Sequence, residues 1–342
     1  MSDPIKLSIC LATFNRANYI GETLDSILPQ LTAGVEIVIV DGASTDNTEQ
    51  VLHGYASAYQ EIRYIRESTN SGIDADYDKS VTYAKGEYCW LMTDDDLLKP
   101  GGLNSIIEQL DGENELVVIN AEVATDDFST VLDSKLIKIE NDKTYLNKDK
   151  DQFMSDAGHG LSFIGCVVIK RELWLSRNRI KFYGTLFIHV GVIFQQPLLK
   201  KVQLLAEPIL SIRYGNAMWT PRGLEIWLSK WPNLIWSFDG YSDEAKAKVC
   251  PLGYFKDLKK LIFFRATGAY GYKELKSILW QRTNWLGRVV FLLIAVIPPK
   301  LMNMLATIYC TMRARTMKMP LYSLIKSKYR NSLSLWASKF IG

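Results

Sequence analysis

Short apolar runs alternate with amphipathic stretches along the N-terminal part of the chain. Each apolar run ends in polar residues, which is typical of a buried parallel strand that leads into a loop. Strands that alternate with helices predict an α/β fold with a doubly wound, mainly parallel sheet. The predicted strands span residues 6–15, 35–44, 62–68 and 87–96, and the predicted helices span residues 17–31, 47–59 and 74–86.

Helix boundaries are marked by a few residues with strong local preferences. Pro29 lacks a backbone N–H, so it should end or kink the first helix. Thr45 or Asp46 is suited to cap the second helix with a side-chain oxygen. Gly86 is predicted to end the third helix.

Polar clusters follow all four predicted strands. They are Thr13–Arg16, Asp41–Ser44, Asn70–Asp74 and Asp94–Asp96. In parallel α/β sheets, ligands bind beyond the carboxyl ends of the strands. We therefore expect the four clusters to line one rim of the sheet and to form the functional site there.

The cluster Asp94–Asp96 places three carboxylates in a row. Two like charges about 4 Å apart repel by roughly 1 kcal/mol in water and by about 4 kcal/mol at an effective dielectric constant near 20. A divalent cation would offset this repulsion, because hard cations prefer oxygen ligands. Solvation on an open loop is the alternative, but the position at a strand end favours a metal site with Asp94, Asp95 and Asp96 as ligands.

Other sequence features exclude several classes of protein. Neither GxGxxG after the first strand nor GxxxxGK[ST] occurs, which argues against a dinucleotide enzyme and a P-loop ATPase. The five cysteines form no CxxC pair, so no zinc site or disulfide framework is expected, and a reducing compartment fits. The N-terminus does not have the charge and apolar pattern of a signal peptide.

The C-terminal region is basic and rich in apolar residues. Residues 275–342 contain eleven Lys or Arg and no Asp or Glu, so the rest of the chain carries −8 of the net charge of +3. The apolar run 289–297 is shorter than the roughly 20 residues that span a bilayer, and Pro298 and Pro299 interrupt it. We predict amphipathic helices on an anionic membrane surface and no nucleic acid, because apolar residues interleave with the basic ones. A buried core helix at residues 286–297 is the alternative.

Several motifs resemble the family 2 glycosyltransferases, whose members have the glycosyltransferase-A fold. The motifs, in order, are SICLATFNRANYIGETLDSIL, EIVIVDGASTDNT, NSG, AKGEYCWL and DDDLLKPGGL, within residues 5–110. A narrower resemblance reaches to about residue 250. GIDADYDKSVTYAKGEYCWLMTDDDLLKPGG, IHVG and RYGNAMW are similar to abequosyltransferase-type enzymes of bacterial O-antigen assembly.

The resemblance implies roles for individual residues in a nucleotide-sugar site. Asp41 would contact the nucleobase, Asp94 the ribose and Asp95 a metal ion, Mn²⁺ or Mg²⁺, with help from Asp96. Thr93 stands where many relatives have the first acid of a DxD motif. The other implied donor-binding residues are Thr13, Asn15, Arg16, Ser44, Asp74, Asp76, Lys79, Arg213 and Trp219. Loop capping by Asp41 and favourable N-terminal helix charges at Asp74 and Asp76 are the alternatives.

Catalysis by such an enzyme needs charge stabilisation on the leaving diphosphate, which a cation on Asp95 would supply. Inverting transfer also needs a general base, and His189 stands where relatives have an acid. His189 in an apolar stretch is also consistent with a packed residue. If the sugar is transferred with retention of configuration, as the narrower resemblance implies, His189 need not be a base.

The resemblance predicts transfer of a sugar, such as the 3,6-dideoxyhexose abequose from a CDP-sugar, to an oligosaccharide on a polyprenyl diphosphate. The predicted location is peripheral, on the cytoplasmic face of the bacterial inner membrane. Residues 1–110 would form the donor half, residues 111–250 the acceptor half, and residues 251–342 the membrane-associating helices. Alternatives are a UDP-, dTDP- or GDP-sugar donor, a catalytically silent nucleotide-sugar-binding scaffold, and a nucleotidyltransferase, which lacks its glycine-rich loop here.

Overall fold

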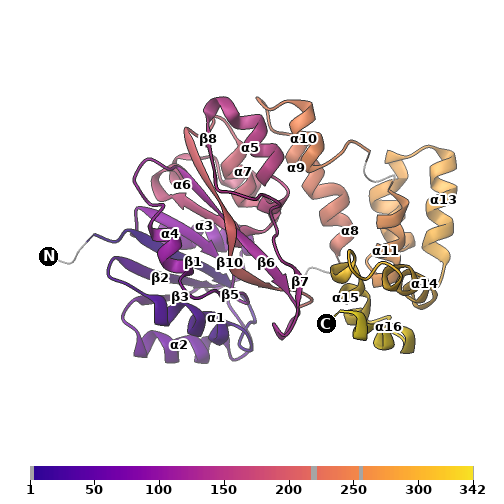
Figure 1. Cartoon of the computed structure of the whole chain (residues 1–342), viewed down its shortest axis with the longest axis horizontal. Helices are drawn as coiled ribbons and strands as arrows, with labels where there is room; N and C mark the ends of the chain where they lie inside the picture. Colours follow the sequence, from indigo (N-terminus) through magenta and orange to yellow (C-terminus); the bar gives the residue numbers. More distant parts are fainter. Residues whose placement is uncertain (1–3, 217–221, 254–256, 342) are drawn as a thin grey trace. The chain divides into compact units, whose positions relative to one another are not determined.

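The computed structural model describes residues 4–216, 222–253 and 257–341, and these residues form two compact units (Figure 1). Of these residues, the first unit contains 4–122, 134–212 and 238–249, and the second contains 123–133, 213–216, 222–237, 250–253 and 257–341. The predicted donor and acceptor halves thus fall largely in the first unit. Their division at residue 110 stays a prediction.

Four parallel strands form the N-terminal half of the sheet in the first unit. They are β1 (Leu7–Thr13), β2 (Val35–Asp41), β3 (Ile62–Arg66) and β4 (Tyr88–Met92), in the spatial order β3-β2-β1-β4. They are connected by α1 (Ile20–Ile27), α2 (Thr48–Ala58) and α3 (Ile73–Tyr83). Strands β1, β2 and β4 are buried along their whole length, as their continuous apolar runs predicted. The predicted α/β fold is confirmed.

The sheet continues with strands that pair in the antiparallel sense. It is therefore a mixed sheet, and the predicted mainly parallel arrangement holds for β1 to β4 alone. Beyond β4 the order is β9-β6-β10-β5, with β8 on β10. β7 pairs with residues 123–124 at the end of β6, and this pair belongs to the second unit. These strands are β5 (Leu97–Leu98), β6 (Leu116–Ala124), β7 (Val131–Asp133), β8 (Lys143–Leu146), β9 (Val167–Lys170) and β10 (Lys201–Arg213). The remaining helices of the first unit are α4 (Gly102–Ile107), α5 (Lys150–Ala157), α6 (Arg171–Ser176), α7 (Ile188–Phe194) and α10 (Asp243–Val249).

Two of the three predicted helix boundaries are observed, and one is shifted. Helix α1 ends at Ile27 and continues as a 3₁₀ turn that contains Pro29. Asp46 accepts hydrogen bonds from the backbone N–H and the hydroxyl of Thr48 at the start of α2. Helix α3 ends at Tyr83 rather than at Gly86. Gly86 serves close packing instead, because a Cβ atom there would lie 2.7 Å from the backbone nitrogen of Ser8.

The second unit is helical and has its own apolar core. Its helices are α8 (Gly223–Glu225), α9 (Trp231–Trp236), α11 (Leu258–Thr267), α12 (Tyr272–Glu274), α13 (Trp285–Val296), α14 (Pro299–Thr311), α15 (Lys318–Lys326) and α16 (Ser332–Ala337). The core combines Leu224 and Leu228 with Leu261, Phe291 and Leu321. The basic C-terminal region is therefore helical, as predicted, and part of it is packed.

Helices α13 and α14 are bent by 96° at the prolines between them. Among the described residues, no single helix is long and apolar enough to cross a membrane, although this bent pair together passes the length and composition test. Phe291, Ile294 and Ala295 of α13 are buried in the core of the second unit. Residues 286–297 thus form a core helix, as the alternative expected, on one face of α13, while the other face is exposed.

Candidate active site

The loops after β1 and β2 are bonded to each other. The backbone N–H of Asn15 donates to Ser44 Oγ at 2.9 Å, and Asn15 Oδ1 accepts from the backbone N–H of Thr45 at 2.7 Å. Asn15 has φ of 55°, a left-handed conformation that asparagine tolerates better than most residues. Asn15 and Ser44, both predicted for donor binding, thus shape the rim between these strands.

Asp41 lies at the end of β2 and is completely buried. Its Oδ1 accepts from the backbone N–H of Ser44 at 2.8 Å, and its Oδ2 accepts from the hydroxyl of Tyr64 at 2.8 Å. Arg66 Nε lies 4.0 Å from Oδ2. These are the contacts of the loop-capping explanation. Recognition of a nucleobase by Asp41 stays a prediction.

Arg16 connects the β1 loop to the acidic cluster after β4. Its Nε lies 3.6 Å from Asp94 Oδ1, and its Nη2 lies 3.3 Å from Asp95 Oδ2. All three side chains are close to nine-tenths buried, so their mutual attraction is stronger than that of a surface pair. Asp96 is also buried, and its carboxylate accepts from the hydroxyl of Thr93.

The acidic cluster carries more negative charge than Arg16 neutralises. Burial and the neighbouring Asp95 raise the pKa of Asp94 to about 7, although Arg16 and the hydroxyl of Thr13 act in the opposite direction. Burial, followed by the charges of Asp94, Asp95 and Asp96, raises the pKa of Tyr77 well above its usual value. The site is therefore suited to a further cation.

The carboxylate oxygens of Asp94 and Asp95 are the donors that Mn²⁺ and Mg²⁺ prefer. Within the described residues, no three His, Cys, Asp or Glu side chains are grouped as a ready-made metal site. Asp96 accepts a hydrogen bond from Thr93, and Asp94 and Asp95 form ion pairs with Arg16. The donor chemistry and the raised pKa fit a cation on Asp94 and Asp95, and the three-aspartate site stays a prediction.

Asp76 and Lys79 of α3 lie in one polar network near the end of β2. Asp76 accepts from the hydroxyl of Ser71 at 2.7 Å, and Lys79 donates to Glu67 at 2.7 Å and to Ser71 at 2.9 Å. Gly42 touches this network, because a Cβ atom there would lie 2.6 Å from Asp76 Oδ2. Burial raises the pKa of Asp76, while the hydrogen bond from Ser71 and the charge of Lys79 act in the opposite direction. The loops after β2 and β3 therefore meet at this point.

Asp74 and Asp78 of α3 bind a different part of the chain, the segment 174–188 before and at the start of α7. Asp74 accepts from the backbone N–H groups of Leu186 at 2.9 Å and Ile188 at 3.1 Å. Asp78 accepts from Trp174 Nε1 at 2.8 Å, Arg179 Nε at 2.6 Å and the Tyr183 hydroxyl at 2.6 Å. Both carboxylates thus hold this segment against α3.

Sequence reasoning missed Asp78. The available signal was its spacing from Asp74, because residues four apart lie on the same face of a helix. The carboxylate of Asp74 accepts from backbone N–H groups just before and at the start of α7, so it caps that helix. Its predicted contact with the nucleotide stays a prediction.

His189 lies in the first turn of α7 and is buried. Its Nε2 is 2.8 Å from the carbonyl oxygen of Leu161, so Nε2 carries the proton of the neutral ring. Burial lowers the pKa of His189 to about 4. The lone pair is then on Nδ1, which is buried and has no hydrogen-bond partner among the described residues. This geometry favours the packed residue, and the general base stays a prediction.

Arg213 belongs to the second unit. Its guanidinium donates to the carbonyl oxygen of Asp126 and lies over the ring of Phe128, with 4.4 Å from Cζ to the ring centroid. Both contacts explain its burial without a ligand, and diphosphate binding by Arg213 stays a prediction. Trp219, the predicted sugar-stacking residue, lies outside the described residues.

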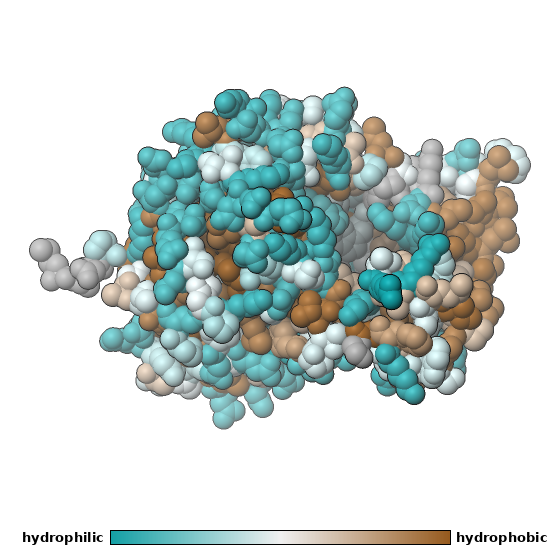
Figure 2. Space-filling model, in the orientation of Figure 1, coloured by the Kyte–Doolittle hydropathy of each residue, from teal (hydrophilic) through white to brown (hydrophobic). Residues whose placement is uncertain are grey.

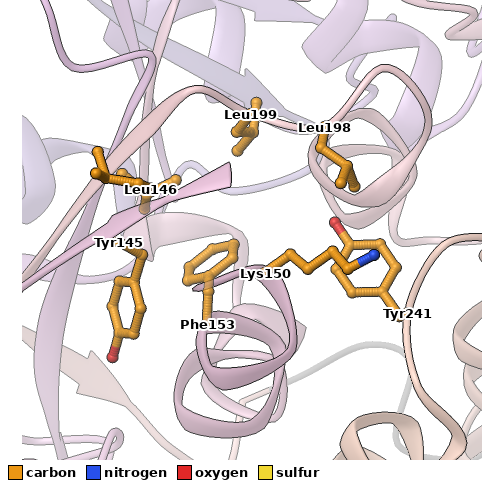
Figure 3. Close-up of a pocket in the computed structure, with 8 residues that line it drawn as sticks. Tyr145, Leu146, Lys150, Phe153, Leu198, Leu199 and Tyr241 are labelled. Carbon is orange, nitrogen blue, oxygen red and sulfur yellow. The ribbon is translucent and has the colours of Figure 1, made fainter. Parts of the chain in front are cut away.

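A small cavity in the first unit is lined by Tyr145, Phe153, Leu199 and Tyr241 (Figure 3). Lys150 extends along its edge toward Tyr241. Its volume of about 10 Å³ is near the minimum for one water molecule, so it cannot hold a nucleotide or a sugar. We therefore assign no site there.

Comparisons with known proteins agree with the observed fold. Residues 8–173 match the family model described as glycosyl transferase family 2. The chain is 27% identical over 231 residues to the abequosyltransferase RfbV of Salmonella typhimurium, covering 64% of this chain and 69% of that protein.

Two solved structures share the fold. The structure of S. aureus TarS 1-349 in complex with UDP has a TM-score of 0.55 and 16% identity, covering 98% of this chain and 91% of TarS. The mannosyltransferase PcManGT from Pyrobaculum calidifontis, in complex with GDP-Man and Mn²⁺, has a TM-score of 0.50 and 17% identity, covering 86% of this chain and 88% of PcManGT. At these identities the two structures establish the fold alone.

Proposed function

We infer that the chain is a family 2 glycosyltransferase, with the family domain at residues 8–173, and that it transfers a sugar from a nucleotide-sugar to a growing bacterial surface polysaccharide. One observation carries the proposal of where this happens. Arg16, from the loop after β1, lies between Asp94 and Asp95, from the loop after β4, at the rim that the loop after β2 also lines. Two loops thus bring an acidic pair and a guanidinium group together beyond the strand ends, beside the loop after β2.

The nucleotide would be held by side chains, because the chain has no glycine-rich phosphate loop. Asp41, Asn15 and Ser44 lie together and are suited to the base and ribose, since carboxylate and amide groups accept and donate hydrogen bonds to base edges. Thr13 lies beside Asp94, the proposed ribose-side acid. Asp76 and Lys79 border the same rim through their contact with Gly42 and Ser71.

Asp95 and Asp94 would hold a divalent cation, which supplies positive charge for the diphosphate leaving group. Arg16 would then be released from the two carboxylates and would be available for the diphosphate, since guanidinium groups bind phosphate oxygens well. Mn²⁺ or Mg²⁺ suits oxygen ligands of this kind. The carboxylate oxygens of Asp94 and Asp95 and the raised pKa of Asp94 support a metal ion at this position.

A CDP-sugar, with abequose as one candidate sugar, is the donor we favour. Its support is the similarity to RfbV, named an abequosyltransferase, over 231 residues at 27% identity. The acceptor we propose is an oligosaccharide on a polyprenyl diphosphate, at the cytoplasmic face of the inner membrane. A UDP-, dTDP- or GDP-sugar and a catalytically silent nucleotide-sugar-binding scaffold are the competing proposals.

The test is a thermal-shift screen of CDP-, UDP-, GDP- and dTDP-sugars with and without Mn²⁺ or Mg²⁺, followed by turnover measurements on Asp95→Asn. We expect a CDP-sugar to give the largest shift, and the metal to increase it. Loss of the Asp95 charge should lower turnover by on the order of 10²-fold or more, because it removes part of the cation site.

The matched control is Asp243→Asn, which changes an exposed acid of α10 in the same unit. It should match the wild-type protein in both measurements. Full activity of Asp95→Asn at limiting metal would contradict the assigned site. Donor binding without any turnover on lipid-linked acceptors would support the scaffold instead.

A further inference from the structure

Helix α13 is apolar apart from Arg288, but the second unit buries only one of its faces. Phe291, Ile294 and Ala295 are in the core, whereas Trp285, Leu286, Leu293 and Val296 are between 55% and 69% exposed. Figure 2 shows apolar side chains gathered over the region of α13. A helix that is hydrophobic all round normally has an apolar environment on every side. Its outer face therefore needs a partner.

Helix α14 repeats this pattern. It turns Met302, Thr307 and Cys310 inward and exposes an outer row at helical spacing. That row consists of Leu301, Met304, Leu305, Ile308 and Met312, which are between 38% and 81% exposed. With α13, this makes an exposed apolar surface on two consecutive helices, which we call the apolar face. Monomeric proteins rarely expose contiguous apolar surface on this scale unless it binds something.

The charges on α13, on α14 and on the chain that follows them are all of one sign. Residues 275–342 contain no acidic residue. Arg288 lies on α13, with its guanidinium 4.9 Å from the ring of Trp280, and Lys300 is in the first turn of α14. Arg313 and Arg315 follow the end of α14. A partner of this face should therefore be apolar in its interior and negatively charged at its surface.

We propose that the apolar face of α13 and α14 docks on an anionic lipid bilayer and lies in its interface without crossing it. A bilayer of anionic lipids offers both an apolar interior and negative headgroups. At 1.5 Å per residue, the 12 residues of α13 are about 18 Å long, well below the roughly 30 Å of the hydrocarbon region. This assignment rests on the proposed function for its choice of membrane and adds the residues that would make contact.

The experiment compares single substitutions in sedimentation with vesicles of phosphatidylglycerol and phosphatidylcholine. Leu293→Glu tests α13, and Leu305→Glu tests α14. Leu146→Glu is the matched control, because Leu146 is a similarly exposed leucine in the first unit. We expect each test variant to bind vesicles at least about tenfold more weakly than the wild type, and the control to bind unchanged. Pure phosphatidylcholine should bind all proteins more weakly than the anionic mixture.

Two outcomes would overturn the proposal. The wild-type protein could ignore both kinds of vesicle. Alternatively, it could be a dimer in solution that Leu293→Glu dissociates while vesicle binding is unchanged, which would make the apolar face a contact between two copies of the chain. Thermal unfolding checks that the variants fold. Donor binding is measured in parallel, and its failure would count against the proposed function without altering the vesicle result.

Discussion

At the scale of single residues, the balance of charge around Arg16 decides how the acidic cluster behaves. Arg16 is within 3.6 Å of Asp94 and within 3.3 Å of Asp95. One cation for two buried carboxylates leaves an excess negative charge, and the pKa of Asp94 rises to about 7 as a result of burial and of Asp95. The protein therefore tolerates a cost in stability at this position, as is common where a charged ligand binds.

Asp94→Asn should make the ligand-free protein more resistant to urea than the wild type. This gain in stability should be larger at about pH 8 than at about pH 5. The carboxyl of Asp94 has its ordinary pKa of 3.8 in the unfolded state and a pKa of about 7 in the folded state. Between these two pH values it is therefore deprotonated in the unfolded state and protonated in the folded state. Wild-type stability therefore falls over this window. The gain from the variant should be larger at the higher pH by about 2 kcal/mol. An equal gain at both pH values would contradict the raised pKa.

His189→Gln should keep turnover within a few-fold of the wild-type rate. The neutral imidazole donates from Nε2 to Leu161, its pKa is about 4, and a glutamine amide can donate from nearly the same place. His189→Ala should instead lower stability by about 1–3 kcal/mol, because it leaves a buried carbonyl without a partner. A loss of 10²–10⁴-fold in His189→Gln, measured as kcat with saturating donor, would restore the general base.

The positions of polar residues after predicted strands located the rim of the sheet, but they did not predict which side chains contact each other there. Asp41, Arg16 and Asp94 follow apolar runs, and parallel strands bring their carboxyl ends to one edge. The sequence carries no sign that Tyr64 would bond Asp41, or that Leu161 would bond His189. Such pairs depend on side-chain packing between distant segments, which periodicity does not record.

At the scale of elements, the aspartates of α3 contact two different parts of the chain. Asp76 contacts the loops after β2 and β3, while Asp74 and Asp78 hold the segment that leads into α7. Gly184 and Leu186 in that segment have φ of 79° and 72°. A left-handed leucine is uncommon and persists only where other contacts determine the backbone. The two carboxylates on α3 provide those contacts.

Asp78→Asn should loosen this segment. Oδ1 of Asp78 accepts from Trp174 and Arg179, and Oδ2 accepts from Tyr183. The substitution removes the charge that strengthens the bond from Arg179 and replaces one of the two acceptor oxygens with an amide donor. We expect amide hydrogen exchange in residues 179–188 to become about tenfold faster or more, with stability lower by about 1.5–3 kcal/mol. Glu172→Gln, in the first turn of α6, is the control. Unchanged exchange in the segment would show that Asp78 does not hold it.

Element prediction succeeded where the apolar pattern is strong and failed where packing decides. The four parallel strands have continuous apolar runs, and all four were predicted. Helix α3 ends earlier than its glycine suggested, because Gly86 is needed for contact with β1. The antiparallel strands β6 to β8 and β10 were not predicted individually. β7 and β8 have short, mixed runs, whereas the longer runs of β6 and β10 carried a signal that went unused.

At the scale of the whole molecule, the sequence predicted the contrast between an acidic α/β part and a basic helical part. It did not predict that residues 123–133 and 213–237 belong with the helical part. Leu132 and Leu224 join a core that extends to Ile341, and Asp126 bonds Tyr322 and Lys326. These contacts join positions about two hundred residues apart, a separation that local sequence patterns cannot report.

The chain enters the second unit three separate times, and this has a consequence for biosynthesis. Synthesis proceeds from the N-terminus, and domains generally fold as units once their residues are available. The strand partners of the first unit are complete by residue 213, whereas Leu132 and Leu224 must wait for α13 to α16 to leave the ribosome. During that interval their apolar side chains are exposed, which is the condition that chaperones recognise.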